Sequence, residues 1–285
     1  MSKHLNHLDQ KSITQILKLC RRIAGSCQIT GACICTNHIL GFSNPKTVMK
    51  VLLIIHDFQP RLMSYVKAFN NRNIIIYAVD EWIFERDVDK GFLGEALAGE
   101  LIFPYVSIAN ERYLHLQEVK LKKRLVLELL ENLVSNFPEL SYQFHIKPEY
   151  FMYETMLSRA RLFPPMIYSL QNFAQKDARK ENRERVMHGY LEALKELEKE
   201  QVILFLDEYV KISQKFADKA RSRKARFINH FKTAQRALFT SLLGTFSTVL
   251  NVLSQNRENL SKFPRNAKEN SNLAHQLEDP KEFLY

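Results

Sequence analysis

The chain has 285 residues, of which 46% are hydrophobic and 25% are charged, and its formal net charge is +10 with a pI near 9.3. This composition is typical of a soluble globular protein with one large domain or two smaller ones, and it excludes a fibrous or wholly disordered chain. The positive charge favours nucleic acid or an anionic membrane surface as a partner, although a solvated basic surface with no specific partner gives the same balance.

Four cysteines, Cys20, Cys27, Cys33 and Cys35, lie close together near the N-terminus. The chain shows no secretory signal, so we expect reduced thiols and a cytoplasmic protein. Cys27, Cys33 and Cys35 offer soft ligands for zinc together with His38, but their spacing lacks the two ligand pairs of a structural zinc site. The favoured interpretation is burial on one face of a strand, and no metal site is predicted.

The first elements in the chain predict an α/β sheet. Residues 12–23 carry apolar side chains at helical spacing and predict an amphipathic helix that lies on the sheet. Strands are expected at three apolar runs, 33–35, 51–55 and 74–79. Residues 60–70 predict a helix between the last two strands. The order strand, strand, helix, strand indicates a sheet that helices cover on one face.

A helical region is predicted after residue 110. Residues 111–136 repeat apolar side chains at helical spacing among charged ones, which predicts a long amphipathic helix. A second helix is expected to start near Pro148 and to end before Pro164. Residues 183–201 predict a third helix, and a hairpin over 202–212 follows it. This order is typical of a winged-helix module, although any helix followed by a hairpin gives it.

The last part of the sequence changes character twice. Residues 215–236 set eight basic side chains against the single acid Asp218. Residues 237–253 then hold no ionisable side chain, so we expect basic and apolar helices in succession. Residues 255–285 are polar and predict a flexible tail.

The most informative stretch is a glycine turn that leads directly into a buried strand. It consists of Gly41-Phe42-Ser43-Asn44-Pro45-Lys46-Thr47-Val48-Met49-Lys50 followed by Val51-Leu52-Leu53-Ile54-Ile55. With the upstream Cys33 to Leu40, it resembles the N-terminal core of the DNA polymerase β-like nucleotidyltransferase superfamily, in particular an archaeal branch with a Gly-Ser turn, then Ser-Asp-x-Asp before a Val-Leu-Leu-Ile strand. Residues 78–95 and 147–151 resemble further segments of that branch, so the resemblance covers about two thirds of the chain.

The resemblance implies a nucleotidyltransferase-like fold, but the acids of the family are absent. Transfer with two magnesium ions needs carboxylates one residue apart, because alternation along a strand turns both toward the metals. Val48 and Lys50 stand at those two places, and Thr36 and Asn37 stand at the Gly-Ser pair. Lys50 would place a positive charge where a divalent cation should bind. We therefore expect a catalytically inactive pseudoenzyme without a cofactor.

Two alternatives for this region stay open. Asp80 and Glu81 follow the third strand and Asp57 follows the second, so an active magnesium-dependent nucleotidyltransferase would use these acids instead. Lys46 and Lys50 would otherwise bind the phosphates of a nucleotide without a metal. The interpretation without a function is that Lys50 extends to the sheet edge and has no chemical role.

Other charged positions predict surface rather than a site. Four acids between residues 85 and 100 lie among basic residues, as in a solvated helix face or loop. They are Asp87, Asp89, Glu95 and Glu100. Four of the histidines are too scattered along the chain to predict a site: His38, His145, His188 and His230.

Two surfaces in the second half are candidates for a polyanionic partner. Arg183 and Arg185, Lys211 on the hairpin, and the basic run with Arg221 and Arg223 would together contact nucleic-acid phosphates, although no base-reading motif is present. The uncharged residues 237–253 are at the lower limit for spanning a membrane. Packing against protein is favoured for them, and peripheral contact with anionic lipid stays open.

We expect four units along the chain. They are a nucleotidyltransferase-like domain over 1–110, a helical region with a winged-helix unit over 111–213, basic then apolar helices over 214–254, and a tail over 255–285. The leading hypothesis is a pseudoenzyme that binds a nucleotide, a nucleic acid or a protein partner.

Overall fold

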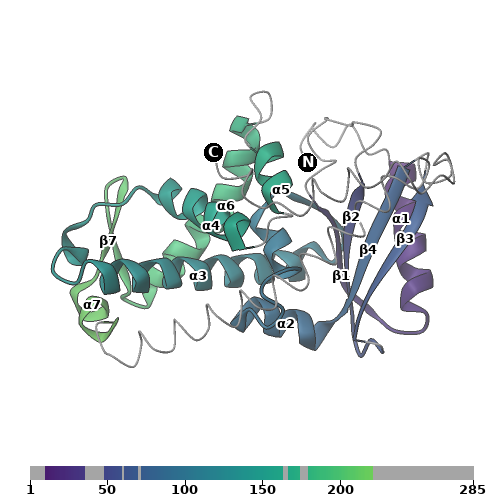
Figure 1. Cartoon of the computed structure of the whole chain (residues 1–285), viewed down its shortest axis with the longest axis horizontal. Coiled ribbons are helices and arrows are strands. Elements are labelled where there is room, and N and C mark those ends of the chain that lie inside the picture. The colour runs from purple at the N-terminus through teal and green to yellow at the C-terminus, as the bar shows by residue number, and fades with distance from the viewer. Residues whose placement is uncertain are drawn as a thin grey trace, which may run out of the picture.

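A five-stranded mixed sheet and a helical part lie side by side in an elongated molecule (Figure 1). The structure is a computed structural model that describes residues 10–35, 48–59, 61–69, 72–162, 166–173 and 179–220. Several positions singled out in the sequence lie outside these residues: Thr36, Asn37, His38, Lys46, Arg221, Arg223, His230 and 237–253.

The sheet has the strand order β3-β4-β2-β1-β5. Its strands are β1 (Ile29–Cys35), β2 (Met49–Ile55), β3 (Leu62–Phe69), β4 (Arg72–Asp80) and β5 (Tyr105–Ala109). β2 pairs with β4 in parallel and with β1 antiparallel, so β2 is the central strand. All seven residues of β2 are buried, as expected for a strand with helices on both faces.

The two faces of the sheet belong to two separate apolar clusters. On one face, α1 (Gln10–Ala24) packs Ile16 and Cys20 against the side chains of Val51 and Leu53. On the other face, Leu52 packs toward the helical part of the molecule. The expectation that helices cover only one face is therefore wrong, because alternation along β2 presents apolar side chains to both sides.

The segment predicted as a helix over 60–70 is the edge strand β3. It pairs antiparallel with β4 over its whole length, from Leu62 opposite Val79 to Phe69 opposite Arg72. Its apolar residues fit a helical stripe as well as a strand, but the open edge of β4 offers unpaired backbone groups that only a strand satisfies. Tertiary pairing therefore overrides the local pattern.

The edge strand β5 at the other side of the sheet was not predicted. Its five residues follow Pro104 and pair antiparallel with β1, from Tyr105 opposite Cys35 to Ala109 opposite Ala32. A run this short gives too few periods for alternation to be recognised.

The helical part confirms the helices predicted from periodicity. It contains α2 (Glu81–Lys90), η2 (Ala98–Ile102), α3 (Glu111–Asn136), η3 (Ser141–Gln143), α4 (Pro148–Leu162), α5 (Met166–Phe173), α6 (Arg179–Lys199) and α7 (Gln214–Ala220). The hairpin predicted after α6 is present as β6 (Ile203–Leu206) and β7 (Tyr209–Ile212), with Asp207 at φ 51° in its two-residue turn. A winged-helix unit stays a prediction.

One apolar cluster runs without interruption from the sheet into the helices. It includes Cys33 and Leu52 of the sheet, Leu121 of α3, Tyr190 of α6 and Val210 of β7. The proposed boundary at residue 110 therefore falls inside a shared core, between β5 and α3.

The contact between α3 and α6 depends on Gly189. A Cβ atom at this position would lie 2.5 Å from Glu118 Oε1 and 2.9 Å from Lys122 Nζ. Lys122 is fully buried, pairs with Glu118, and donates a hydrogen bond of 2.9 Å to the Val186 carbonyl of α6. The glycine thus allows α6 to lie directly on a buried ion pair of α3.

We predict that Gly189→Ala lowers the free energy of unfolding. Overpacking against the fixed Glu118 and Lys122 costs about 1–3 kcal/mol, which exceeds the gain of about 1 kcal/mol in helix propensity. Urea denaturation measures the difference. Lys195→Ala, on the exposed side of the same helix, is the control and is expected to change stability by about 0.5 kcal/mol or less.

Candidate functional site

Val48 and Lys50, at the places where the family resemblance expects two acids, are both buried. Val48 lies just before β2 and Lys50 is its second residue. Only 6% of Lys50 is exposed, so its side chain does not extend to solvent at the sheet edge, and that expectation is wrong. The position holds a buried cation inside the core between sheet and helices.

Glu100 of η2 is the counter-ion of Lys50. Lys50 Nζ donates a hydrogen bond of 3.1 Å to Glu100 Oε1, and both side chains are almost fully buried. Burial favours the neutral amine, but the charge and hydrogen bond of Glu100, together with Tyr77 and Cys35, outweigh it and raise the pKa of Lys50 above its usual value. Glu100 Oε2 has no hydrogen-bond partner among the described residues. A phosphate group would have to displace Glu100 to bind this ammonium.

The acids between residues 85 and 100 are mostly buried, so the prediction of a solvated face is wrong for them. Asp87 is fully buried and accepts hydrogen bonds from the backbone N–H groups of Leu93, Glu95 and Ala98. Burial raises the pKa of Asp87 to about 6, although the three backbone hydrogen bonds act to lower it. Asp87 thereby folds the segment after α2 back on itself.

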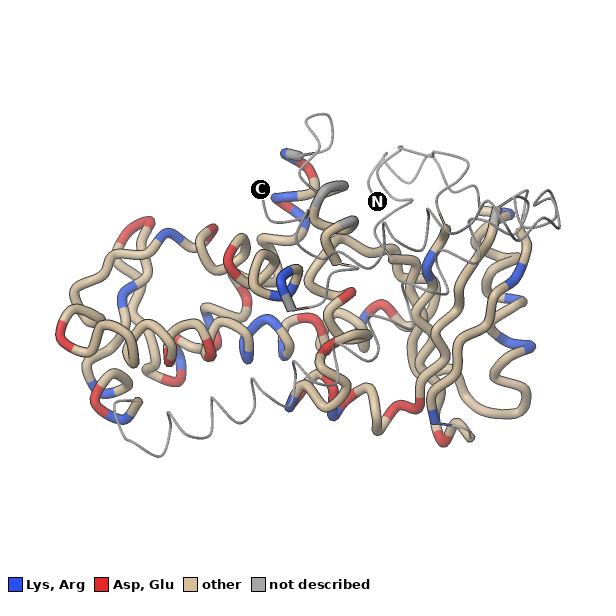
Figure 2. Tube along the Cα trace, viewed as in Figure 1, with Lys and Arg blue, Asp and Glu red and all other residues tan. Residues whose placement is uncertain are grey.

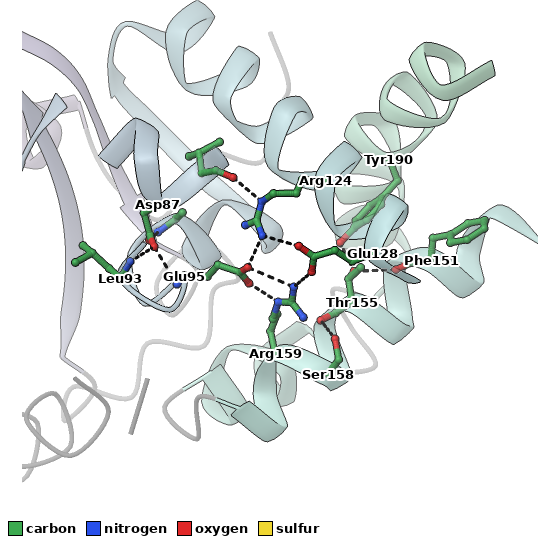
Figure 3. A network of polar contacts seen from close by, with 12 residues as sticks. Asp87, Leu93, Glu95, Arg124, Glu128, Phe151, Thr155, Ser158, Arg159 and Tyr190 are labelled. Carbon is green, nitrogen blue, oxygen red and sulfur yellow. Dashed lines mark hydrogen bonds and ion pairs between the residues drawn. The ribbon is translucent and has the colours of Figure 1, made fainter. Parts of the chain in front are cut away.

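Glu95, in the same segment, is the centre of a buried charge network (Figure 3). Arg124 of α3 contacts its Oε1 at 2.7 Å, and Arg159 of α4 contacts both of its oxygens. Both arginines also pair with Glu128, at 2.9 Å each. Two carboxylates and two guanidinium groups therefore join α3 and α4 to the segment that precedes η2.

A surface hollow lined by described residues lies at the opposite end of the sheet, at the carboxyl ends of the parallel strands β2 and β4. Its volume is about 660 Å³ and it is open to solvent. The lining residues are His56, Asp57, Arg61, Asp80, Glu81, Trp82, Ile83 and Glu85. This edge of an open α/β sheet is where ligands commonly bind.

Most charged groups of the hollow have partners within the protein. Asp80 caps α2 by accepting from the N–H of Trp82, accepts also from the N–H of Phe58, and pairs with Arg61 at 3.1 Å. Glu81 Oε2 accepts from Thr30 and lies 2.7 Å from His56 Nδ1. The Glu81 hydrogen bond raises the pKa of His56.

Asp80 and Glu81 do not lie near Lys50. In the parallel pairing Lys50 is opposite Ile75, whereas Asp80 is opposite Ile55. Five residues of strand separate the two levels, about 16 Å. The structure thus separates these acids from positions 48 and 50, and the alternative in which they replace the missing pair there is contradicted by the register.

Of the basic residues expected to contact nucleic acid, the three that the structure describes, Arg183, Arg185 and Lys211, do not form one patch. Arg183 is exposed near the start of α6, whereas Lys211 lies in β7, beyond the end of that helix (Figures 1 and 2). Sixteen residues of helix separate Arg183 from the end of α6, about 24 Å. Arg185 donates a hydrogen bond to the carbonyl of Tyr105, so its guanidinium supports the contact between α6 and β5.

The cysteines behave as apolar side chains. Cys20, Cys33 and Cys35 are buried, and Cys33 and Cys35 face the same cluster, as predicted. Burial raises the pKa of the Cys20 thiol to about 12. Within the described residues no helix is long and apolar enough to cross a membrane.

Comparisons with known proteins identify no family. No protein-family model matches the sequence, and a search of curated proteins gives no match. A solved structure of a nucleotidyltransferase-like protein from Exiguobacterium sibiricum is similar to this chain with a TM-score of 0.31 and 14% sequence identity, over 89% of this chain and 81% of that chain. At that TM-score the similarity carries no argument about fold or activity.

We predict that Lys50→Met lowers the free energy of unfolding by about 3–5 kcal/mol, because it leaves Glu100 buried without a counter-ion. The double variant Lys50→Met/Glu100→Gln should recover at least half of this loss, since it removes the unpaired charge. Urea denaturation of the two variants tests the pair. Equal stability of the single and double variants would contradict it.

Proposed function

We propose that the protein is a nucleotidyltransferase-like pseudoenzyme that acts by binding a partner. The fold assignment rests on the resemblance of Gly41 to Ile55, and the mixed sheet provides a buried central strand at the expected place. The Lys50–Glu100 ion pair is the observation that supports a loss of catalytic activity.

The physical argument concerns charge at the start of β2. A metal-dependent site needs convergent carboxylates that face a divalent cation. Here one residue of the expected pair is apolar, and the other supplies its own cation, which Glu100 neutralises at 3.1 Å. A magnesium ion at this point would be repelled by the ammonium and would find one carboxylate that is already paired.

The hollow at the carboxyl ends of β2 and β4 is the binding place that the geometry favours. Four carboxylates line it, from Asp57, Asp80, Glu81 and Glu85, against one arginine and one histidine. Figure 2 shows the acidic positions at the end of the sheet where β4 leads into α2. This balance disfavours a phosphate-rich ligand and favours a cationic group.

Trp82 gives the hollow an aromatic surface. It is 53% exposed, and the guanidinium of Arg86 lies 4.3 Å from the centre of its ring. An exposed indole is a favourable contact surface for a cationic group. Tryptophan and arginine are enriched at protein interfaces. The proposed partner is therefore a protein that presents a basic segment.

The first test is of catalysis. Calorimetric titration of the full chain with magnesium should show no binding of the ion at the start of β2. Incubation with each nucleoside triphosphate and magnesium should give no nucleotide transfer. Metal-dependent turnover above a Lys50→Met/Glu100→Gln control would refute the pseudoenzyme proposal.

The second test uses Trp82, the single tryptophan of the chain, as a fluorescence reporter of the hollow. A lysine-rich peptide should change its emission saturably, whereas ATP and a single-stranded oligonucleotide should not. Asp57→Asn should weaken peptide binding severalfold, because asparagine tolerates the left-handed backbone at φ 50° while the charge is lost.

Asp89→Asn is the matched control, because Asp89 lies in the last turn of α2, where it pairs with Lys120. Its peptide affinity should equal that of the wild type. Binding of the oligonucleotide or ATP in place of the peptide would refute the choice of partner and favour a nucleotide or nucleic-acid ligand.

A further inference from the structure

The packing of α3 on α6 brings three potential metal ligands together at the surface. His115 comes from α3, and His188 and Glu192 are one helical turn apart on α6. One ligand atom from each of the three lies within 4.8 Å of the others. No local sequence pattern indicates this group, because His115 and His188 are 73 positions apart along the chain.

The distances are close to those of a coordinated cation. His115 Nε2 lies 2.8 Å from Glu192 Oε2, and His188 Nδ1 lies 3.4 Å from Glu192 Oε1. Ligand atoms around a tetrahedral zinc ion, bound at about 2.0–2.1 Å, are about 3.3 Å apart. Small side-chain rotations would therefore complete the geometry, and the partly exposed side chains leave a path for the ion.

Glu118 provides the outer contact that orients a metal-binding histidine. Its Oε2 lies 3.6 Å from His115 Nδ1, on the side of the ring away from Glu192. The same carboxylate accepts a hydrogen bond of 2.8 Å from Tyr105 and pairs with the buried Lys122. A carboxylate at this place favours the ring orientation in which Nε2 of His115 points toward Glu192.

The backbone on both sides of the group is fixed by burial. Gly189 and Tyr190 are buried beside His188, and Lys122 ties α3 to the Val186 carbonyl. The ligands therefore project from two rigid helices whose separation is set by the close approach at Gly189.

We propose that His115, His188 and Glu192 bind a divalent transition cation of the zinc type, with a fourth position open to water. Two imidazoles and one carboxylate suit zinc, nickel or copper and not calcium or magnesium, which prefer all-oxygen sites. The bound ion would link α3 to α6 across the seam between the helices. This site is separate from the start of β2 and from the hollow.

In the absence of a metal, a proton is the competing occupant. Glu118 and Glu192 raise the pKa of His115 to about 9, so the protonated ring forms ion pairs with both carboxylates. A purely structural ion-pair cluster of this kind would bind no zinc, and the experiment distinguishes the two.

The test is calorimetric titration of the full chain, freed of metal by a chelator, with zinc chloride alone. The wild type should bind one more equivalent of zinc than His115→Ala/His188→Ala, and Glu192→Gln should weaken that equivalent at least tenfold. Saturating zinc should raise the thermal midpoint of the wild type and leave that of the double variant unchanged.

His145→Ala is the matched control, because this histidine lies against Tyr209 of the hairpin, and it should retain wild-type binding. The single variant His188→Ala changes a largely exposed side chain and keeps the test valid if the double variant does not fold. Equal zinc stoichiometry and affinity in the wild type, His188→Ala and Glu192→Gln would overturn the proposal.

Discussion

The pairing of buried charges in the segment from α2 to η2 is the constraint on which the arrangement of the molecule depends. Within a few residues this segment presents two carboxylates to different parts of the molecule: Glu100 to Lys50 in the sheet, and Glu95 to Arg124 and Arg159 in the helices. A buried ion pair adds little net stability, but removal of one partner leaves an uncompensated charge at high cost. Sheet and helices are therefore held in one relative placement by charges that cannot be separated cheaply.

This constraint also bears on function. The start of β2 faces the shared core, and the ammonium that replaces an acid there is neutralised internally by Glu100. At the other end of the same strand, four carboxylates and Trp82 line an open hollow. The two ends of β2 thus differ in chemistry, with a closed ion pair at one and an open acidic surface at the other. The open acidic surface therefore suits a binding role, whereas the closed ion pair does not suit a transfer reaction.

The contact between α3 and α6 also depends on a buried charge that has its partners within the protein. Lys122 is completely buried and would be costly alone, but Glu118, the Val186 carbonyl and the Tyr190 ring, whose centre is 4.7 Å from Nζ, surround it. Glycine at position 189 leaves room for this group, because a Cβ atom there would lie within 3.0 Å of both Glu118 and Lys122. The precise approach of the two helices then places His115 beside His188 and Glu192 as a consequence.

The sequence by itself determined the elements whose patterns are long or strongly apolar, α1, β2, α3 and α6, because periodicity over several turns reports which face is buried. It also determined that positions 48 and 50 lack acids. The tertiary structure alone decided that residues 62–69 form an edge strand, since the open edge of β4 is supplied by residues distant from the local pattern. It alone decided that Asp87, Glu95 and Glu100 are buried, because alternating charge looks the same whether the partner is water or an arginine many residues away. Lys50 and Glu100, and likewise His115 and His188, meet only through packing, so no local pattern of residues contains their pairing.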